Sequence, residues 1–134
     1  MALAGTLAAN LVRLRGAQGI TLTWTYHPRP LNTAVANSAL VIAAKFGFDV
    51  TLLCPSADYL LDERYLKSAE DMCRHHGRTL KVTHDLKDGY RGADVVYAKS
   101  WGALPFFGRW DAEKPQREAA RGFMVDMAKM EQTP

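Results

Sequence analysis

The sequence predicts an α/β fold in which helices cover both faces of a parallel sheet, giving three αβα layers. Strand-like and helix-like segments alternate along the 134 residues. Successive strands lie about 15 to 30 residues apart, which with a helix in each connection favours right-handed crossovers between parallel strands. With 48% hydrophobic and 23% charged residues, the composition is that of one globular domain with its own core. The expected architecture is therefore Rossmann-like or flavodoxin-like.

The first strand is expected at 20–24, where β-branched and aromatic residues dominate. The loop 26–32 contains two prolines, which fix the backbone and end the strand. A helix follows, capped by Asn32 or Thr33 and ended by Gly47. Apolar residues three to four positions apart form its expected buried face: Val35, Ala39, Ile42, Ala43 and Phe46.

A second strand and helix repeat this pattern. Residues 50–53 form a short apolar strand that a proline ends, and Asp62 is the expected cap of the next helix. The apolar face of that helix comprises Leu66, Ala69, Cys73 and His76. A third, half-exposed strand is expected at 80–83 and a fourth at 94–98, joined by the short segment 85–92.

The last part of the chain is expected to be a loop followed by helix. Residues 101–110 contain two glycines and a proline and read as the loop. Residues 115–130 read as one or two helices, with Pro115 near the first helical position and Asp126 as a second cap. Methionines recur there at helical spacing, either as core or as an interface: Met124, Met127 and Met130.

The charge and the cysteine and histidine content argue against several classes of function. Lys and Arg total 17 against 14 Asp and Glu, and they are spread along the chain, so no nucleic-acid partner is expected. Cys54 and Cys73 are too far apart for a redox or zinc motif, and both are expected to be buried in a reducing, cytoplasmic setting. His75 and His76 have no further ligand at metal-binding spacing. No apolar run reaches the roughly 20 residues of a membrane helix.

Ligands of open α/β sheets bind beyond the carboxyl ends of the strands, where the strand order reverses. With the first strand in the middle of the sheet, that point lies between the loops that follow Trp24 and Ala98. Neither loop carries a dinucleotide-binding or P-loop glycine pattern, and the chain has no serine-hydrolase elbow or zinc-peptidase motif. No cofactor, no metal and no catalytic residue is therefore expected in this chain.

Five residues of these two loops are the candidate substrate-binding residues. Lys99 emerges from an apolar strand and is expected to meet a carboxylate or phosphate, the alternative being a solvated surface lysine. His27 and Asn32 either contact the ligand or only shape and cap their loop. Ser100 and Trp101 are expected to line the pocket, although Trp101 equally fits a core position with its N–H bonded to backbone.

The runs 22–38, 50–64 and 95–108 together resemble the ornithine-binding domain of N-acetylornithine carbamoyltransferases, in the aspartate/ornithine carbamoyltransferase superfamily. Ordinary ornithine carbamoyltransferases carry Asp-x-Trp-x-Ser-Met in the fourth-strand loop, where this chain has Lys99-Ser-Trp-Gly-Ala-Leu104. A lysine there repels the α-ammonium of free ornithine, whereas an acylated α-amine is uncharged and leaves the α-carboxylate to pair with Lys99. The resemblance thus implies an N-acylated ornithine as the substrate, with N-acetyl-L-ornithine favoured and N-succinyl-L-ornithine as the open alternative. In the family, the choice of acyl group depends largely on a loop of the amino-terminal domain.

The resemblance also implies parts that this sequence lacks. Members of the family have a Ser-x-Arg-Thr phosphate loop and a His-x-x-Gln motif in an amino-terminal domain, and His-Cys-Leu-Pro further on. Residues 1–16 are therefore expected to be the remnant of an interdomain helix, and 17–134 an incomplete N-acylornithine-binding domain, truncated at both ends. Carbamoyl phosphate would bind the missing domain, so the chain is expected to be inactive alone.

The resemblance implies that the intact enzyme is a cytoplasmic homotrimer that transfers a carbamoyl group to the side-chain amine of the acylated ornithine, in arginine biosynthesis. The alternative is a stand-alone flavodoxin-like module that binds a small carboxylate without catalysis.

Overall fold

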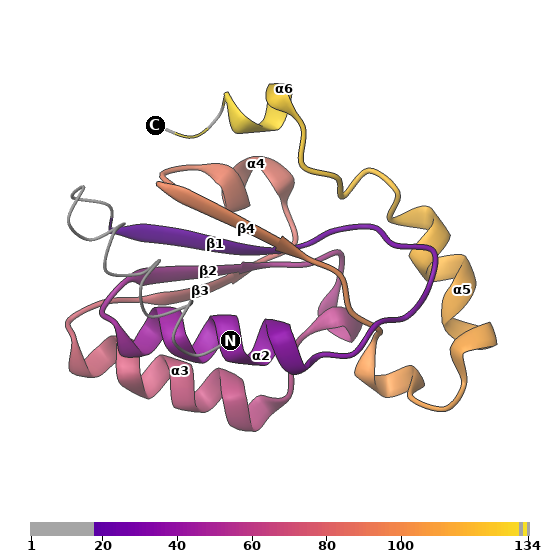
Figure 1. Cartoon of the computed structure of the whole chain (residues 1–134), viewed down its shortest axis with the longest axis horizontal. Helices are drawn as coiled ribbons and strands as arrows, with labels where there is room; N and C mark the ends of the chain where they lie inside the picture. Colours follow the sequence, from indigo (N-terminus) through magenta and orange to yellow (C-terminus); the bar gives the residue numbers. More distant parts are fainter. Residues whose placement is uncertain (1–17, 132, 134) are drawn as a thin grey trace.

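The computed structural model describes residues 18–131 and 133, and it contains a parallel sheet with helices on both faces (Figure 1). The strands are β1 (Gly19–Trp24), β2 (Asp49–Leu53), β3 (Leu80–Thr83) and β4 (Val95–Lys99). They lie in the order β3-β2-β1-β4, and every pairing is parallel. The predicted α/β class and parallel sheet are confirmed. The predicted interdomain remnant, 1–16, lies outside the described residues.

Helices α2 (Ala34–Lys45) and α3 (Glu63–His75) cover one face of the sheet, and α4 (Leu86–Tyr90) and α6 (Met127–Met130) lie on the other (Figure 1). Helix α5 (Trp110–Ala119) lies past the carboxyl ends of the strands, with the short 3-10 turns η1 (Ala57–Tyr59) and η2 (Leu104–Phe106) in the loops before it. Helix α4 falls in the segment expected only to join two strands. Its cap is Asp85, whose side chain accepts a bond from the Asp88 amide at 2.9 Å.

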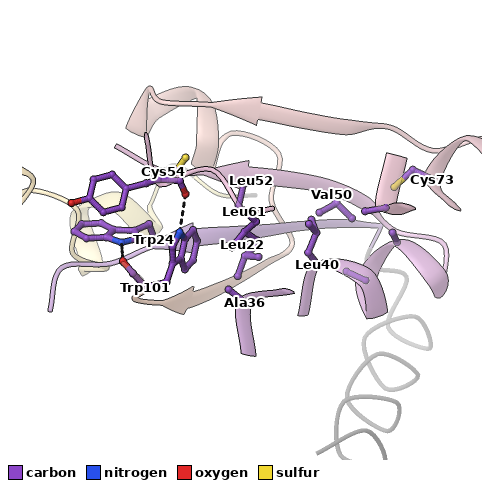
Figure 2. Packing of buried hydrophobic residues seen from close by; sticks show 14 of the residues in the cluster. Leu22, Trp24, Ala36, Leu40, Val50, Leu52, Cys54, Leu61, Cys73 and Trp101 are labelled. Carbon is purple, nitrogen blue, oxygen red and sulfur yellow. Dashed lines mark hydrogen bonds between the residues drawn. The ribbon is translucent and has the colours of Figure 1, made fainter. Parts of the chain in front are cut away.

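The main core lies between the sheet and the pair α2 and α3 (Figure 2). It is formed by residues from strands and helices that are at most 7% exposed, among them Leu22, Trp24, Leu40, Val50, Leu52, Ala69 and Cys73. Both cysteines are buried, as predicted. Asp62 caps α3 as predicted, because its side chain accepts a bond from the Arg64 amide. Within the part of the chain that the structure describes, no helix is long and apolar enough to cross a membrane.

The buried faces of both long helices differ from the prediction. Of the residues expected to be buried on α2, only Ala43 is; Val35, Ala39, Ile42 and Phe46 are half-buried. The buried stripe is Ala36, Leu40, Ala43 and Ala44. Helix α2 packs against α3 as well as the sheet, and small residues allow that close approach on two sides. His76 lies beyond the end of α3 and is exposed, with its ring Nε2 2.9 Å from the carbonyl of Lys45.

The first of the two C-terminal helices begins earlier than predicted. Helix α5 begins at Trp110, so Pro115 lies inside it and not near its first position. The contacts of Trp110 and of two buried charged residues on α5 outweigh the one helical hydrogen bond that a proline cannot donate. Asp126 caps the separate helix α6, as predicted. Met124 and Met127 are 47% and 77% exposed, so the core alternative for these two is wrong.

Candidate ligand-binding site between β1 and β4

The carboxyl ends of β1 and β4 lie side by side at the same level. Their register pairs Trp24 with Lys99, and the Thr25 amide donates to the Lys99 carbonyl at 3.1 Å. Strand β2 lies on the other side of β1, so the chain continues in one direction from β1 and returns on the opposite side as β4. This is the reversal of strand order that the sequence predicted, and it brings the two candidate loops together.

The two loops are joined beyond the strands by a close backbone contact. The Gly102 amide donates to the Leu31 carbonyl at 2.9 Å. A Cβ at position 102 would lie 2.8 Å from the Trp110 ring and 3.0 Å from Cβ of Pro30. Only glycine lets the backbone approach that closely. Asn32 is next to this contact in the chain, and Lys99 is three residues from it.

Lys99 is half-buried and has no acidic partner. Its Nζ donates to the neighbouring Ser100 carbonyl at 3.0 Å. Among residues 18–131, no carboxylate forms an ion pair with it. A partly desolvated ammonium without a counter-ion is less stable than one paired with an anion. The chemistry of Lys99 therefore suits an anionic ligand.

Ser100 is 4% exposed, and its Oγ has no hydrogen-bond partner among the described residues. Buried hydroxyls are nearly always bonded, so one without a partner is a candidate for ligand contact. Trp101 is fully buried, and its Nε1 donates to the Tyr59 carbonyl at 2.7 Å (Figure 2). The Trp101 ring is thus part of the core, the alternative that the sequence left open. The backbone carbonyl of Trp101 accepts a hydrogen bond from Nε1 of Trp24 at 2.8 Å.

His27 and Asn32 both bond to the backbone of their own loop. Nδ1 of His27 accepts from the Arg29 amide at 3.0 Å. Oδ1 of Asn32 accepts from the Ala34 amide at 2.6 Å, whereas Thr33 makes no side-chain cap bond to α2. Asn32 is exposed and lines an open hollow of about 410 Å³ over α2, which Lys99 does not line. Both residues shape the loop, and direct ligand contact by either stays a prediction.

Two buried charged residues of α5, which the sequence analysis missed, connect the candidate loops. Arg117 and Glu113 are each 1% exposed and form an ion pair at 2.7 Å. Arg117 also donates from Nη1 to the His27 carbonyl at 2.9 Å and from Nη2 to the Trp101 carbonyl at 3.1 Å. The sequence feature that could have indicated this ion pair is the four-residue spacing of Glu113 and Arg117 on a helix. Such pairs usually lie on a solvated face, which is why the spacing alone does not indicate burial.

Tyr59 also contacts this buried pair of Glu113 and Arg117. Its hydroxyl donates to Oε1 of Glu113 at 2.6 Å, and the Arg117 guanidinium lies 5.6 Å from the centroid of the Trp24 ring. Burial, and then the bond to Glu113, raise the pKa of Tyr59 above its ordinary value. The phenol therefore stays neutral and remains a hydrogen-bond donor throughout the physiological pH range.

Together these features define an α/β ligand-binding domain with a lysine at its switch point that suits a small carboxylate. A family model described as "Aspartate/ornithine carbamoyltransferase, Asp/Orn binding domain" matches residues 18–134. The chain belongs to the aspartate/ornithine carbamoyltransferase family, and the resemblance seen in its loops is confirmed.

Similar proteins agree with this assignment. Over 117 residues the chain is 63% identical to N-acetylornithine carbamoyltransferase of Xylella fastidiosa, with 87% of this chain and 34% of that protein covered. Identity to ornithine carbamoyltransferase of Methanothermobacter thermautotrophicus is 33%, with 72% of this chain and 31% of that protein covered. A crystal structure of acetylornithine transcarbamylase complexed with acetylcitrulline is 53% identical, with a TM-score of 0.89 over 96% of this chain and 41% of that one. The chain thus spans about a third of the length of the curated relatives it matches.

Proposed function

We propose that the protein containing this chain transfers the carbamoyl group of carbamoyl phosphate to the side-chain amine of an N-acylated ornithine, with N-acetyl-L-ornithine favoured over N-succinyl-L-ornithine. This chain supplies the half that binds the amino acid. The observation that carries the proposal is Lys99, a half-buried ammonium at the carboxyl end of β4 with no carboxylate partner among the described residues.

The charge of Lys99 accounts for the preference for an acylated substrate. The α-carboxylate of the substrate pairs with the ammonium, in place of the weaker bond to the Ser100 carbonyl. Free ornithine would bring a second ammonium next to the same site, and like charges repel strongly where water is scarce. Acylation of the α-nitrogen removes that charge. The buried hydroxyl of Ser100, which has no partner among the described residues, is the second group assigned to the ligand.

The reaction itself needs groups beyond this chain. The side-chain amine attacks the carbonyl carbon of carbamoyl phosphate, the amine loses a proton, and phosphate leaves. Stabilising the charge on that phosphate requires a set of fixed donors, which we assign to the family's carbamoyl-phosphate domain. We infer that the chain alone is inactive and that the intact protein is a cytoplasmic homotrimer of arginine biosynthesis. The two free, buried cysteines support a reducing compartment.

The test uses a hybrid enzyme in which residues 18–134 replace the matching segment of the 63% identical Xylella protein. Formation of N-acetylcitrulline from carbamoyl phosphate and N-acetyl-L-ornithine is measured, with L-ornithine as the competing substrate. We expect activity with N-acetyl-L-ornithine and little with L-ornithine. A hybrid that prefers L-ornithine would contradict the proposed role of this chain.

The same hybrid tests Lys99 directly. Lys99→Ala is expected to lower kcat/KM roughly ten- to a hundredfold, because a hydrogen bond to a charged group contributes about 1.5–3 kcal/mol. Lys67→Ala, an exposed lysine of α3, is the matched control and should leave kcat/KM unchanged. Equal kcat/KM values for the two variants would contradict the proposed role of Lys99. Binding of acetate to the isolated chain as tightly as N-acetyl-L-ornithine would instead favour a carboxylate-binding module without catalysis.

A further inference from the structure

We propose that Arg117, held in place by Glu113, is a positioning residue that fixes the distance between the two loops of the ligand site. The proposal deepens the proposed function and, in its effect on ligand affinity, rests on it. Arg117 is assigned no ligand contact, because its side chain is only 2% exposed and both of its Nη atoms are already bonded to Glu113 or to backbone carbonyls. It acts through the backbone of the loops that carry His27 and Lys99.

The guanidinium bonds to both loops at once. Nη1 donates to the carbonyl of His27, in the loop after β1, at 2.9 Å. Nη2 donates to the carbonyl of Trp101, in the loop after β4, at 3.1 Å. A guanidinium is rigid and planar, so two carbonyls bonded to different nitrogens are held at a fixed separation. Lysine keeps the charge but lacks this planar fork.

The arrangement around Arg117 favours a role in positioning over one in stability. Buried ion pairs gain little stability overall, because removing two charges from water offsets their attraction. Here Nε of Arg117 and Oε2 of Glu113 have no hydrogen-bond partner among the described residues, which adds to that cost. Tyr59 holds the remaining carboxylate oxygen at 2.6 Å, so the pair is fixed in orientation despite its incomplete bonding.

A short run of backbone connects Arg117 to the substrate-binding lysine. The Trp101 carbonyl bonded by Arg117 directly follows Ser100, whose own carbonyl accepts the bond from Nζ of Lys99. On the other loop, the His27 carbonyl precedes Asn32 and the first turn of α2. Loss of either bond to Arg117 lets one loop move relative to the other. The ammonium of Lys99 then loses its fixed place relative to the loop after β1.

The experiment compares two Glu–Arg pairs with the same spacing. Arg117→Lys is the test variant, and Arg74→Lys is its control, because Arg74 pairs with Glu70 at 3.3 Å across one turn of α3 and is 72% exposed. Val50→Ala, in the core at the far end of β2, supplies a variant of lower stability with an intact site. For each variant of the 134-residue chain we measure Tm, the Kd for N-acetyl-L-ornithine, and amide hydrogen exchange in 27–32 and 99–102.

Arg117→Lys is expected to raise the Kd for N-acetyl-L-ornithine about tenfold, which corresponds to about 1.4 kcal/mol. It is also expected to speed amide hydrogen exchange in both loops together. Arg74→Lys should change neither, and Val50→Ala should lower Tm while leaving Kd within about twofold. An unchanged Kd in Arg117→Lys, or an equal loss of affinity in Val50→Ala, overturns the proposal. If the unaltered chain does not bind N-acetyl-L-ornithine, the proposed function fails. The exchange data then decide alone: joint acceleration supports positioning, and acceleration of one loop or neither overturns it.

Discussion

The polar groups of Lys99 and Ser100 are available to a ligand because of the backbone around them. Among the described residues, Lys99 ends β4 and its ammonium bonds to the next carbonyl alone, and the buried hydroxyl of Ser100 has no partner. Neither residue type is unusual on its own. What makes the pair chemically distinctive is the contact at Gly102, which brings the loop of Leu31 against the loop of Lys99.

Gly102→Ala is expected to damage this contact. The new Cβ would meet the Trp110 ring at 2.8 Å and Pro30 at 3.0 Å, so the ring or the loop must move. Overpacking of this kind costs about 1–3 kcal/mol, measured as a lower urea midpoint, and the Kd for N-acetyl-L-ornithine should rise as well. Gly122→Ala is the control, because a Cβ there meets no atom within 4 Å. Equal stability of the two variants would contradict the close approach at position 102.

At the scale of whole elements, α2 and α5 hold the site from two sides. Helix α2 begins in the loop after β1, with the side chain of Asn32 bonded to its first residue, Ala34. Helix α5 lies beyond the strand ends, and its Arg117 is bonded to the loops on both sides of the switch point. The sequence placed Asn32 correctly at the start of α2, but it left open whether the side chain caps the helix or contacts the ligand.

Two substitutions at Asn32 separate these roles. Asn32→Ala removes the acceptor for the Ala34 amide and should lower the free energy of unfolding by about 1 kcal/mol. Asn32→Asp keeps an acceptor there, so stability is expected to stay near that of the unaltered chain. The added negative charge should nevertheless weaken binding of N-acetyl-L-ornithine if Asn32 lies near its carboxylate. Urea unfolding and ligand titration of both variants provide the measurements, and unchanged affinity in Asn32→Asp would rule out ligand contact.

The sequence predicted those elements whose pattern is local. The four strands within residues 18–131 were all predicted, because each is a short apolar or alternating run between turn residues. The loops at the switch point followed from the order of these strands. The start of α5 was missed because Pro115 reads as a first helical residue, whereas contacts of Trp110 begin the helix earlier. The buried pair of Glu113 and Arg117 was missed because its partners, two backbone carbonyls and the Tyr59 hydroxyl, are distant in the sequence.

At the scale of the whole molecule, titratable groups set both pH limits of stability. Bonds from the Gln18 and Gly19 amides lower the pKa of Asp94 below its ordinary 3.8, and the bond from Lys81 does the same for Asp88. At the alkaline end, burial raises the pKa of Tyr59 above 10 and that of Cys54 to about 12. The charged carboxylates and the neutral phenol are therefore the forms that the fold prefers.

The free energy of unfolding is accordingly expected to be level between about pH 4 and pH 8.5. A carboxyl with a lowered folded pKa stabilises the fold above its unfolded pKa, so stability falls as the pH drops below about 4. A thiol or phenol with a raised folded pKa stabilises the fold below its unfolded pKa. Stability therefore falls above about pH 8.5 because of Cys54, and further above about pH 10 because of Tyr59. Urea midpoints measured from pH 2 to 11 check both limits. Asp94→Asn removes one carboxylate that takes up a proton on acid unfolding. The fall in stability below about pH 4 should therefore be less steep in this variant. An unchanged slope would show that the two amide bonds to Asp94 do not contribute.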